Sequence, residues 1–158
     1  SILMIIDVDH FKKINDHYGH PIGDKALISL SNVLRRILRA DDIVGRIGGE
    51  EFGILLPDTG EAEGQIIGEM IRHEVEAMVF EPHPGLRHVV TVSVGVTCAM
   101  PYHQPANLLR HADTALLEAK RSGRNQVVMF EPGLRTKPRP FYDSAQDKKS
   151  VKIPSIMR

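Results

Sequence analysis

Acidic residues at two places in the sequence have the surroundings expected of metal ligands. Asp7 lies at the end of an apolar, β-branched run from Ile2 to Val8, which is predicted to be a strand buried on both faces. A buried carboxylate is costly unless it is paired or coordinates a cation. Glu50 and Glu51 follow a glycine pair at the tip of a predicted hairpin. If the first strand lies beside this hairpin, Asp7 and Glu50 converge into a hard oxygen site suited to Mg²⁺, completed by a backbone carbonyl, water and substrate phosphate.

Asp9, which lies two residues after Asp7, and the two hairpin acids also have ordinary structural explanations. Asp9 is placed to cap the helix that follows it. Composition alone favours a solvated turn for Glu50 and Glu51. Several other chemistries lack their motifs, because the sequence has no Walker phosphate loop, no G-x-G-x-x-G, no G-x-S-x-G and no H-E-x-x-H. A zinc site is therefore not expected from the histidines.

Hydrophobic spacing predicts alternating strands and helices. Strands are expected over Ile2–Val8, Ile43–Ile47, Phe52–Leu56, Val89–Val96 and Gln126–Phe130, and helices over Phe11–His17, Asp24–Leu38, Glu61–Val79 and Ala106–Ser122. Asp24 is expected to cap its helix, and Gly123 to end the last one. Gly48 and Gly49 predict a tight antiparallel hairpin, because glycine takes positive φ at no steric cost. The expected fold class is α/β (α+β), with a central, mostly antiparallel sheet flanked by helices.

The composition fits one globular domain of 158 residues with balanced charge. The 20 Lys and Arg residues match the 20 Asp and Glu residues, whereas nucleic-acid coat proteins and membrane-surface proteins are normally basic. The single cysteine, Cys98, excludes an intrachain disulfide and indicates a reducing, cytoplasmic compartment. Because the chain starts at Ser1 within an apolar run, we expect it to be a piece of a longer protein. We expect the folded domain at residues 1–131 and a flexible, basic, proline-containing tail at residues 132–158.

Several blocks of the sequence together resemble one protein family. Arg46-Ile47-Gly48-Gly49-Glu50-Glu51-Phe52 is similar to the signature of the GGDEF family, the diguanylate cyclases, in its Glu-for-Asp form. The other blocks follow the family's order and spacing: Asp7-Val8-Asp9-His10-Phe11-Lys12, Ile14-Asn15-Asp16, Gly19-His20, Gly23-Asp24, Ser93-Val94-Gly95, Ala112-Asp113-Thr114-Ala115, Ala119-Lys120 and Gly123-Arg124-Asn125. The resemblance covers residues 2–130 and implies a fold similar to adenylyl cyclase catalytic domains and polymerase palms. Members of the family condense two GTP into cyclic di-GMP and release two pyrophosphates. The family's usual upstream helix, with its Asp-x-Leu-Thr segment, is missing from this sequence.

The resemblance implies a role for each acidic residue of the site. Mg²⁺ (or Mn²⁺) would be held by the Asp7 carboxylate, the Val8 carbonyl and Glu50. Glu50 would also take the proton from the attacking 3′-hydroxyl. Glu51 would either contact the residues that hold the metal or bind a second metal ion.

The resemblance also implies which residues bind the nucleotide. Lys12 would hold phosphate oxygens during transfer, and Lys120 and Arg124 would reach the β- and γ-phosphates. The alternative for the last two is that cations at the end of a helix only complement its dipole.

The guanine base would be read by Asn15 and Asp24. A carboxylate suits the N1–H and 2-amino donors of guanine, which adenine does not offer. His20 would lie near the same pocket, and Phe11 and Gly49 would also belong to the substrate site.

A second site is implied just before the hairpin. Arg39-Ala40-Asp41-Asp42 is similar to the family's inhibitory R-x-x-D motif, where a product dimer binds through residues corresponding to Arg39 and Asp42. The alternative is an ion pair between these two residues after a helix. The family often adds an arginine from the next helix, where this chain has Met70 with Arg72 nearby. The strength of product inhibition therefore stays open.

We expect an active enzyme that works as a symmetric homodimer, because each domain holds one GTP. One alternative is a catalytically inactive module that binds GTP or cyclic di-GMP. Another is a polymerase-like palm, but residues 2–130 lack a basic stripe, and Asn15 and Asp24 fit guanine, so no nucleic-acid partner is expected. A membrane would be contacted only through the upstream region.

Overall fold

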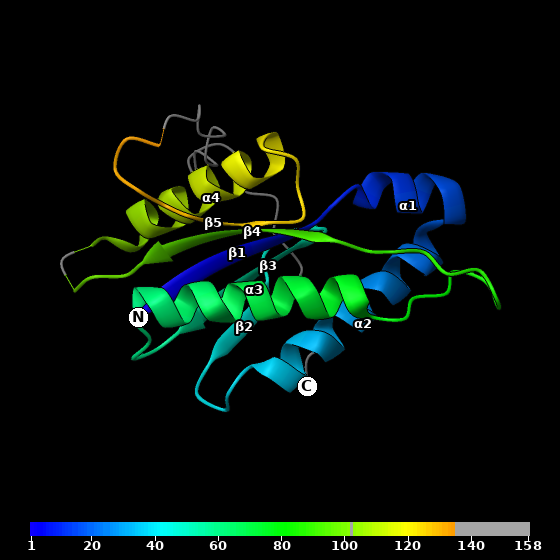
Figure 1. Cartoon of the computed structure of the whole chain (residues 1–158), viewed down its shortest axis with the longest axis horizontal. Helices are drawn as coiled ribbons and strands as arrows, with labels where there is room; N and C mark the ends of the chain where they lie inside the picture. Colours follow the sequence, from blue (N-terminus) through cyan, green and yellow to red (C-terminus); the bar gives the residue numbers. More distant parts are fainter. Residues whose placement is uncertain (102, 135–158) are drawn as a thin grey trace, which may run out of the picture.

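A computed structural model describes residues 1–101 and 103–134, which form one sheet with helices on both faces (Figure 1). The strands are β1 (Ile2–Val8), β2 (Ile43–Arg46), β3 (Glu51–Leu56), β4 (Val92–Cys98) and β5 (Val127–Met129), and the helices are α1 (Phe11–Tyr18), α2 (His20–Ile37), α3 (Glu61–Ala77) and α4 (Pro105–Arg121). The predicted order of elements is confirmed. The predicted tail falls mostly on residues 135–158, which lie outside the described residues. Within the described part of the chain, none of the helices is both long and apolar enough to cross a bilayer.

The strand β1 lies at the centre of the sheet, whose order over the described residues is β2-β3-β1-β4-β5. It pairs antiparallel with both β3 and β4, and β2 pairs antiparallel with β3, while β5 runs parallel to β4. The expected mostly antiparallel sheet is therefore confirmed. A strand in this position must be apolar on both faces, which is why the run from Ile2 to Val8 contains so few polar residues.

Two helical layers enclose the sheet. The helices α2 and α3 cover one face and α4 covers the other (Figure 1). Ile2, Met4 and Ile6 of β1 belong to the main core with α2 and α3, whereas Ile5 packs against Leu116 of α4. Because successive strand side chains alternate between faces, Asp7 lies on the same face as Ile5, beneath the C-terminal end of α4.

The helix α2 begins at His20, so the prediction that Asp24 caps it is wrong. Gly19 has a φ of 90° and separates α1 from α2, and Pro21 follows in the first turn. Proline suits that position because its missing N–H would have no partner there in any case. Apolar spacing did not reveal the true start of the helix, because His20, Asp24 and Lys25 are polar and exposed.

Asp9 does not cap α1, and that prediction is wrong as well. The capping position is His10, with a φ of 54° and no side-chain cap hydrogen bond among the described residues. The Asp9 carboxylate is buried and instead accepts hydrogen bonds of 2.7 Å from both Thr91 Oγ1 and Ser93 Oγ. Asp9 therefore joins the end of β1 to the segment that leads into β4.

Candidate active site

The acidic residues predicted to converge do so at one end of the sheet. Asp7 of β1 lies directly opposite Glu51 of β3, and the backbone N–H of Val8 donates to the Glu50 carbonyl over 3.3 Å. Directly opposite residues on paired strands share a face of the sheet. The predicted neighbourhood of Asp7 and the hairpin acids is therefore confirmed.

The charge balance of this cluster favours a bound cation. The pKa of Asp7 is raised to about 6, chiefly because the carboxyl is buried, and the charges of Glu50 and Glu51 raise it further. Lys120 acts in the opposite direction, since its Nζ lies 3.0 Å from Asp7 Oδ2. Burial outweighs that single ammonium group. A divalent cation would balance the negative charge of Asp7, Glu50 and Glu51, which Lys120 offsets only in part.

The donor chemistry fits Mg²⁺ or Mn²⁺ held jointly by protein and substrate. Among residues 1–101 and 103–134, no three His, Cys, Asp or Glu side chains are placed to hold a metal ion by themselves. Mg²⁺ is commonly bound through one or two carboxylates, with waters and substrate phosphates completing the shell. Asp7, the Val8 carbonyl and Glu50 are hard oxygen donors of that kind.

The hairpin turn between β2 and β3 is built differently from the prediction. Neither Gly48 nor Gly49 adopts the positive φ that was expected of them. A Cβ at position 48 would lie 2.8 Å from Glu51 Oε2, so the Glu51 carboxylate would have to move, whereas a Cβ at position 49 would meet no described atom within 4 Å. Gly49 therefore leaves open space beside Glu50, into which a ligand can approach.

Arg46 supports this turn, a role that was not predicted from the sequence although the residue is part of the signature quoted above. Its guanidinium donates to the carbonyl oxygens of Gly48 and Gly49, so one side chain closes the backbone loop that carries Glu50. Hydrophobic periodicity cannot predict this contact, because backbone carbonyl groups are present at every position of the sequence. The position of Arg46 just before the glycine pair was the one available signal.

Of the residues predicted for the substrate site, Asn15 and Phe11 lie beside Gly23, where α1 packs on α2. Asn15 Oδ1 is buried and has no hydrogen-bond partner among the described residues. A Cβ on Gly23 would lie 1.8 Å from this oxygen, so the two helices approach closely there, with Phe11 packed beside them in the core. Asp24 follows Gly23 and is exposed, as is His20. An unpaired buried acceptor requires an explanation, and a bound donor such as a guanine N–H provides one.

Of the three predicted phosphate-binding cations, Lys120 is the one that the structure shows in contact with the acidic cluster. Lys120 contacts Asp7, as described above. Lys12 is exposed on α1, where its Nζ lies 3.0 Å from Asp16 Oδ2. Arg124 is exposed in the turn after α4, with a φ of 65°.

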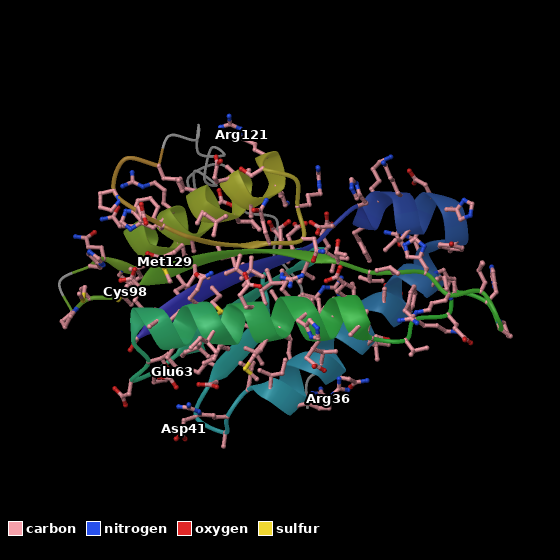
Figure 2. All side chains as sticks on the ribbon, viewed as in Figure 1. Arg36, Asp41, Glu63, Cys98, Arg121 and Met129 are labelled. Carbon is pink, nitrogen blue, oxygen red and sulfur yellow. The ribbon has the colours of Figure 1, made fainter. Side chains whose placement is uncertain are left out.

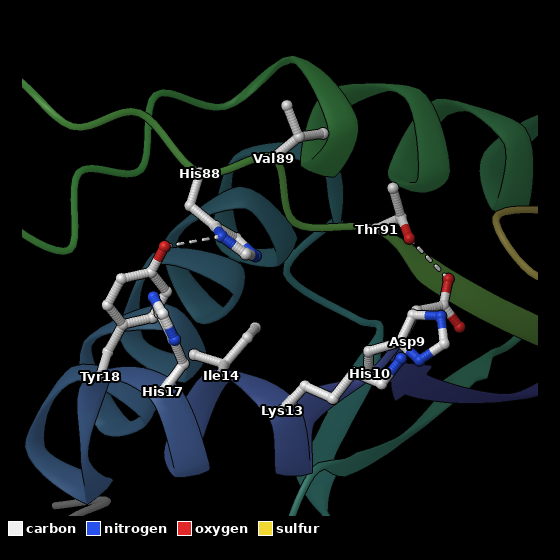
Figure 3. A pocket seen from close by; sticks show the side chains of 9 residues that line it. All are labelled: Asp9, His10, Lys13, Ile14, His17, Tyr18, His88, Val89 and Thr91. Atoms are coloured by element: carbon white, nitrogen blue, oxygen red, sulfur yellow. Dashed lines mark hydrogen bonds between the residues drawn. The ribbon is translucent and has the colours of Figure 1, made fainter.

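A pocket of about 470 Å³ lies between α1 and the segment that includes His88, Val89 and Thr91 (Figure 3). Its lining includes His10, which precedes α1, and Lys13 and His17 of α1, which helical spacing places on one side of the helix. Tyr18 and His88 close the far end through a 3.2 Å hydrogen bond (Figure 3). Asn15 and Asp24 do not line this pocket, so it is distinct from the predicted guanine site.

The R-x-x-D segment does not form the ion pair that was considered as its alternative. The Asp42 carboxylate accepts a 2.7 Å hydrogen bond from the backbone N–H of Arg39. The Arg39 guanidinium instead reaches Glu63 on α3, with Nη2 lying 2.6 Å from Oε1. Glu63 lies near the start of α3, above the loop that carries Asp41 (Figure 2). Met70 is 48% exposed, and Arg72 is bound to glutamates of its own helix.

Known proteins are similar to this chain in sequence and in fold. The family model described as diguanylate cyclase, GGDEF domain, matches residues 1–126. The probable diguanylate cyclase DgcT of Escherichia coli (strain K12) is 41% identical over 129 residues, which is 80% of this chain and 28% of that protein. The response regulator PleD of Caulobacter vibrioides is 43% identical over 127 residues, 79% of this chain and 28% of that protein. The chain thus spans little more than a quarter of the length of these curated relatives.

Solved structures show the same architecture. The GGDEF domain of DgcB from Caulobacter crescentus, in complex with c-di-GMP, has a TM-score of 0.78 and 32% identity, covering 83% of this chain and 78% of that one. The active GGEEF domain of a diguanylate cyclase from Vibrio cholerae has a TM-score of 0.77 and 32% identity, covering 83% of both chains. With the family model matched along most of its length, the chain belongs to the GGDEF family of diguanylate cyclase domains.

Proposed function

We propose that this chain is the catalytic domain of a diguanylate cyclase that condenses two GTP into cyclic di-GMP and two pyrophosphates. The observation that carries the proposal is the meeting of Asp7 with Glu50 and Glu51 at one end of the sheet. These acids are intact, and the relatives that match the chain include proteins named as diguanylate cyclases.

In the proposed reaction the protein forms no covalent bond to the substrate, and its side chains bind, orient and accept a proton. The 3′-oxygen of one GTP forms a bond to the α-phosphorus of the other, and the bond from that phosphorus to the leaving pyrophosphate breaks. Glu50 accepts the proton of the 3′-hydroxyl, while Glu51 keeps the local potential negative beside Asp7. Asp7, the Val8 carbonyl and Glu50 would hold Mg²⁺ (or Mn²⁺), which would supply positive charge against the phosphates and the oxygens that attack and leave.

Cationic and polar side chains position the nucleotide around this centre. Lys120 lies at the edge of the acidic cluster and, with Lys12 and Arg124, holds phosphate oxygens. Positioning and charge stabilisation supply most of the acceleration in phosphoryl transfer.

The junction of α1 and α2 holds the base. Asn15 and Asp24 accept hydrogen bonds from the guanine edge, and the buried Asn15 oxygen gains the partner that it lacks. His20, Phe11 and Gly49 shape the surrounding pocket. Discrimination against ATP follows, because adenine would leave these acceptors unpaired.

Two copies of the domain face one another in a symmetric homodimer. Each copy binds one GTP, and each 3′-hydroxyl attacks the nucleotide held by the other copy. The product, cyclic di-GMP, is also the inhibitor that binds at Arg39 and Asp42.

The test is turnover of GTP with Mg²⁺, measured as cyclic di-GMP by chromatography, on this chain and on a longer protein that extends it upstream. We expect product that disappears when EDTA removes the metal and returns when Mg²⁺ or Mn²⁺ is restored. Tight cyclic di-GMP binding without any turnover by the longer protein would identify a binding module instead. Nucleotide incorporation on a primer would identify a polymerase.

Glu63→Gln is expected to strengthen product inhibition. Glu63 pairs with Arg39 over 2.6 Å and competes for the guanidinium that would bind the product. Exposed ion pairs contribute about 0.2–1 kcal/mol, which corresponds to a decrease in the half-inhibitory cyclic di-GMP concentration of up to about fivefold.

Glu74→Gln provides the matched control, because Glu74 lies on the same helix and forms a comparably exposed pair with Arg36 at 4.0 Å. Inhibition curves measured at fixed GTP should shift for Glu63→Gln alone. An unchanged curve, or weaker inhibition, would contradict the competition between Glu63 and product.

A further inference from the structure

The turn that follows α4 has an unusual backbone at a functional position. Arg124 has a φ of 65° and Asn125 a φ of 46°, directly after Gly123 with a φ of 118°. Residues other than glycine seldom adopt this left-handed conformation, and consecutive ones persist only where their surroundings hold them. Such residues gather at binding and catalytic sites. The contacts that hold this turn therefore determine where Arg124 lies.

One set of contacts ties the turn to the centre of the sheet. The backbone N–H of Asn125 donates to Asp9 Oδ2 over 3.0 Å, and the N–H of Arg124 donates to the Ala119 carbonyl over 2.9 Å. Asp9 is 5% exposed and follows Asp7 by two residues in the chain. The turn is thereby placed relative to the acidic cluster through its backbone.

A second set ties the turn to α3. Asn125 Oδ1 accepts a hydrogen bond from Arg72 Nη1 over 3.1 Å, and Asn125 Nδ2 donates to Glu76 Oε1 over 3.0 Å. Arg72 itself donates to Glu69 and Glu76, each over 2.8 Å. Both the oxygen and the nitrogen of the Asn125 side-chain amide are thus bound by α3, a helix that is far from the turn in the sequence.

The charges of this network reinforce it. Hydrogen bonds to Glu69 and Glu76 raise the pKa of Arg72, and the bonds from Arg72 and Asn125 lower the pKa of Glu76. The Arg72 side chain is only 20% exposed. The guanidinium of Arg72, the arginine considered above for the product site, is therefore occupied by Glu69, Glu76 and Asn125.

We propose that Asn125, held by Arg72 and Glu76 of α3, is a positioning residue that fixes the backbone of Arg124 so that its guanidinium meets the triphosphate. This inference rests on the proposed function, in which Arg124 binds phosphate. Asn125 itself touches no reacting atom. The helix α3, which lies across the sheet from α4, thereby contributes to nucleotide binding (Figure 1).

Asn125→Gly isolates the side-chain contacts. Glycine adopts a φ of 46° without strain and keeps the N–H that donates to Asp9, so only the amide group is removed. Asp58→Gly is the matched control, because Asp58 also has a left-handed φ, of 49°, and follows the strand end that pairs with Ile2, at the opposite end of β1 from Asp7.

The first measurement is equilibrium binding of the α,β-methylene analogue of GTP with Mg²⁺, whose bridging carbon prevents release of pyrophosphate. We expect Kd for the analogue to rise about fivefold to tenfold for Asn125→Gly. Arg124→Ala removes the charged contact altogether, so its Kd should rise more, by about 10- to 100-fold. In turnover, KM for GTP should rise by the same factor while kcat at saturating GTP stays within about twofold. Asp58→Gly should leave both quantities unchanged.

The decisive measurement combines the two substitutions. If Asn125 acts through Arg124, Asn125→Gly has no further effect on Kd in the Arg124→Ala background. Fully additive losses, or an unchanged Kd for Asn125→Gly alone, overturn the positioning role. Arg72→Met should reproduce the effect of Asn125→Gly, whereas Arg121→Met should not, because Arg121 points outward at the end of α4 (Figure 2).

Hydrogen exchange separates this inference from the proposed function. The backbone N–H at position 125 should be less protected from exchange in Asn125→Gly than in the wild type, relative to the intrinsic rate of each residue and with no nucleotide present. Unchanged protection overturns the anchoring of the turn even if GTP binds normally. A wild-type chain that binds no GTP analogue overturns the proposed function and the positioning role with it, while the exchange result still reports whether α3 holds the turn.

Discussion

Glu50→Gln is expected to lower cyclic di-GMP synthesis by about 10³-fold or more. The substitution keeps the size and shape of the side chain and removes its negative charge, so it weakens a metal ligand and removes the proposed proton acceptor together. A positioned general base alone contributes about 10²–10⁴-fold to a rate. Product formation from GTP and Mg²⁺ is followed by chromatography at saturating substrate.

The fold of Glu50→Gln should be intact, which separates chemistry from stability. Glu50 contributes a like charge next to Asp7, so its removal relieves repulsion and should leave the thermal unfolding midpoint unchanged or slightly raised. Glu61→Gln is the matched control, because Glu61 begins α3 close to Gly64, which packs on Ile2 at the other end of β1. Retention of turnover within tenfold of wild type by Glu50→Gln would show that the acidic cluster is not the catalytic centre.

Gly95→Ala is expected to be among the most destabilising single changes in the domain, by about 3 kcal/mol or more. A Cβ on Gly95 would lie 2.1 Å from the Ala112 carbonyl oxygen and 2.3 Å from the Leu116 nitrogen. These are backbone atoms of α4, which cannot rotate away as a side chain can. The whole helix must shift away from β4 and β1, and Lys120 shifts with it away from Asp7.

Denaturant unfolding measures this effect as a change in the free energy of unfolding. The control is Gly45→Ala in β2, where a Cβ would meet no described atom within 4 Å. Its stability should be unchanged or raised by about 0.5–1 kcal/mol, since alanine restricts the unfolded chain more than glycine does. If both substitutions have equal effects on the unfolding midpoint, α4 does not pack on the sheet as closely as described.

The order of elements was predictable because it depends on local patterns. Apolar runs and helical spacing located each strand and helix, and the glycine pair before Glu50 and Glu51 located the hairpin. The boundaries were less predictable where polar residues occupy the first turn of a helix. At His20 the start of α2 is set by Gly19 and Pro21, not by the apolar residues that follow Asp24.

The same division applies to the candidate site. The residues themselves indicated Asp7 and Glu50 as candidates, whereas Lys120 was indicated by the resemblance to the GGDEF family. Neither indicated that Lys120 pairs with Asp7, since that contact joins the last helix to the first strand. Asp9 shows the limit most clearly, because a local rule assigned it to a helix cap while two hydroxyl groups from the distant β4 region bind its carboxylate.

By itself, the sequence determined the order of the elements, the acidic and basic side chains that we propose for the site, and the family to which the chain belongs. Only the tertiary structure decided which of those side chains meet. Periodicity and propensity are properties of neighbouring residues, whereas a hydrogen bond such as that between Asn125 and Arg72 exists only after β5 and α3 have packed on the same sheet. That packing minimises exposed apolar surface for the whole chain, so no single stretch of sequence records its outcome.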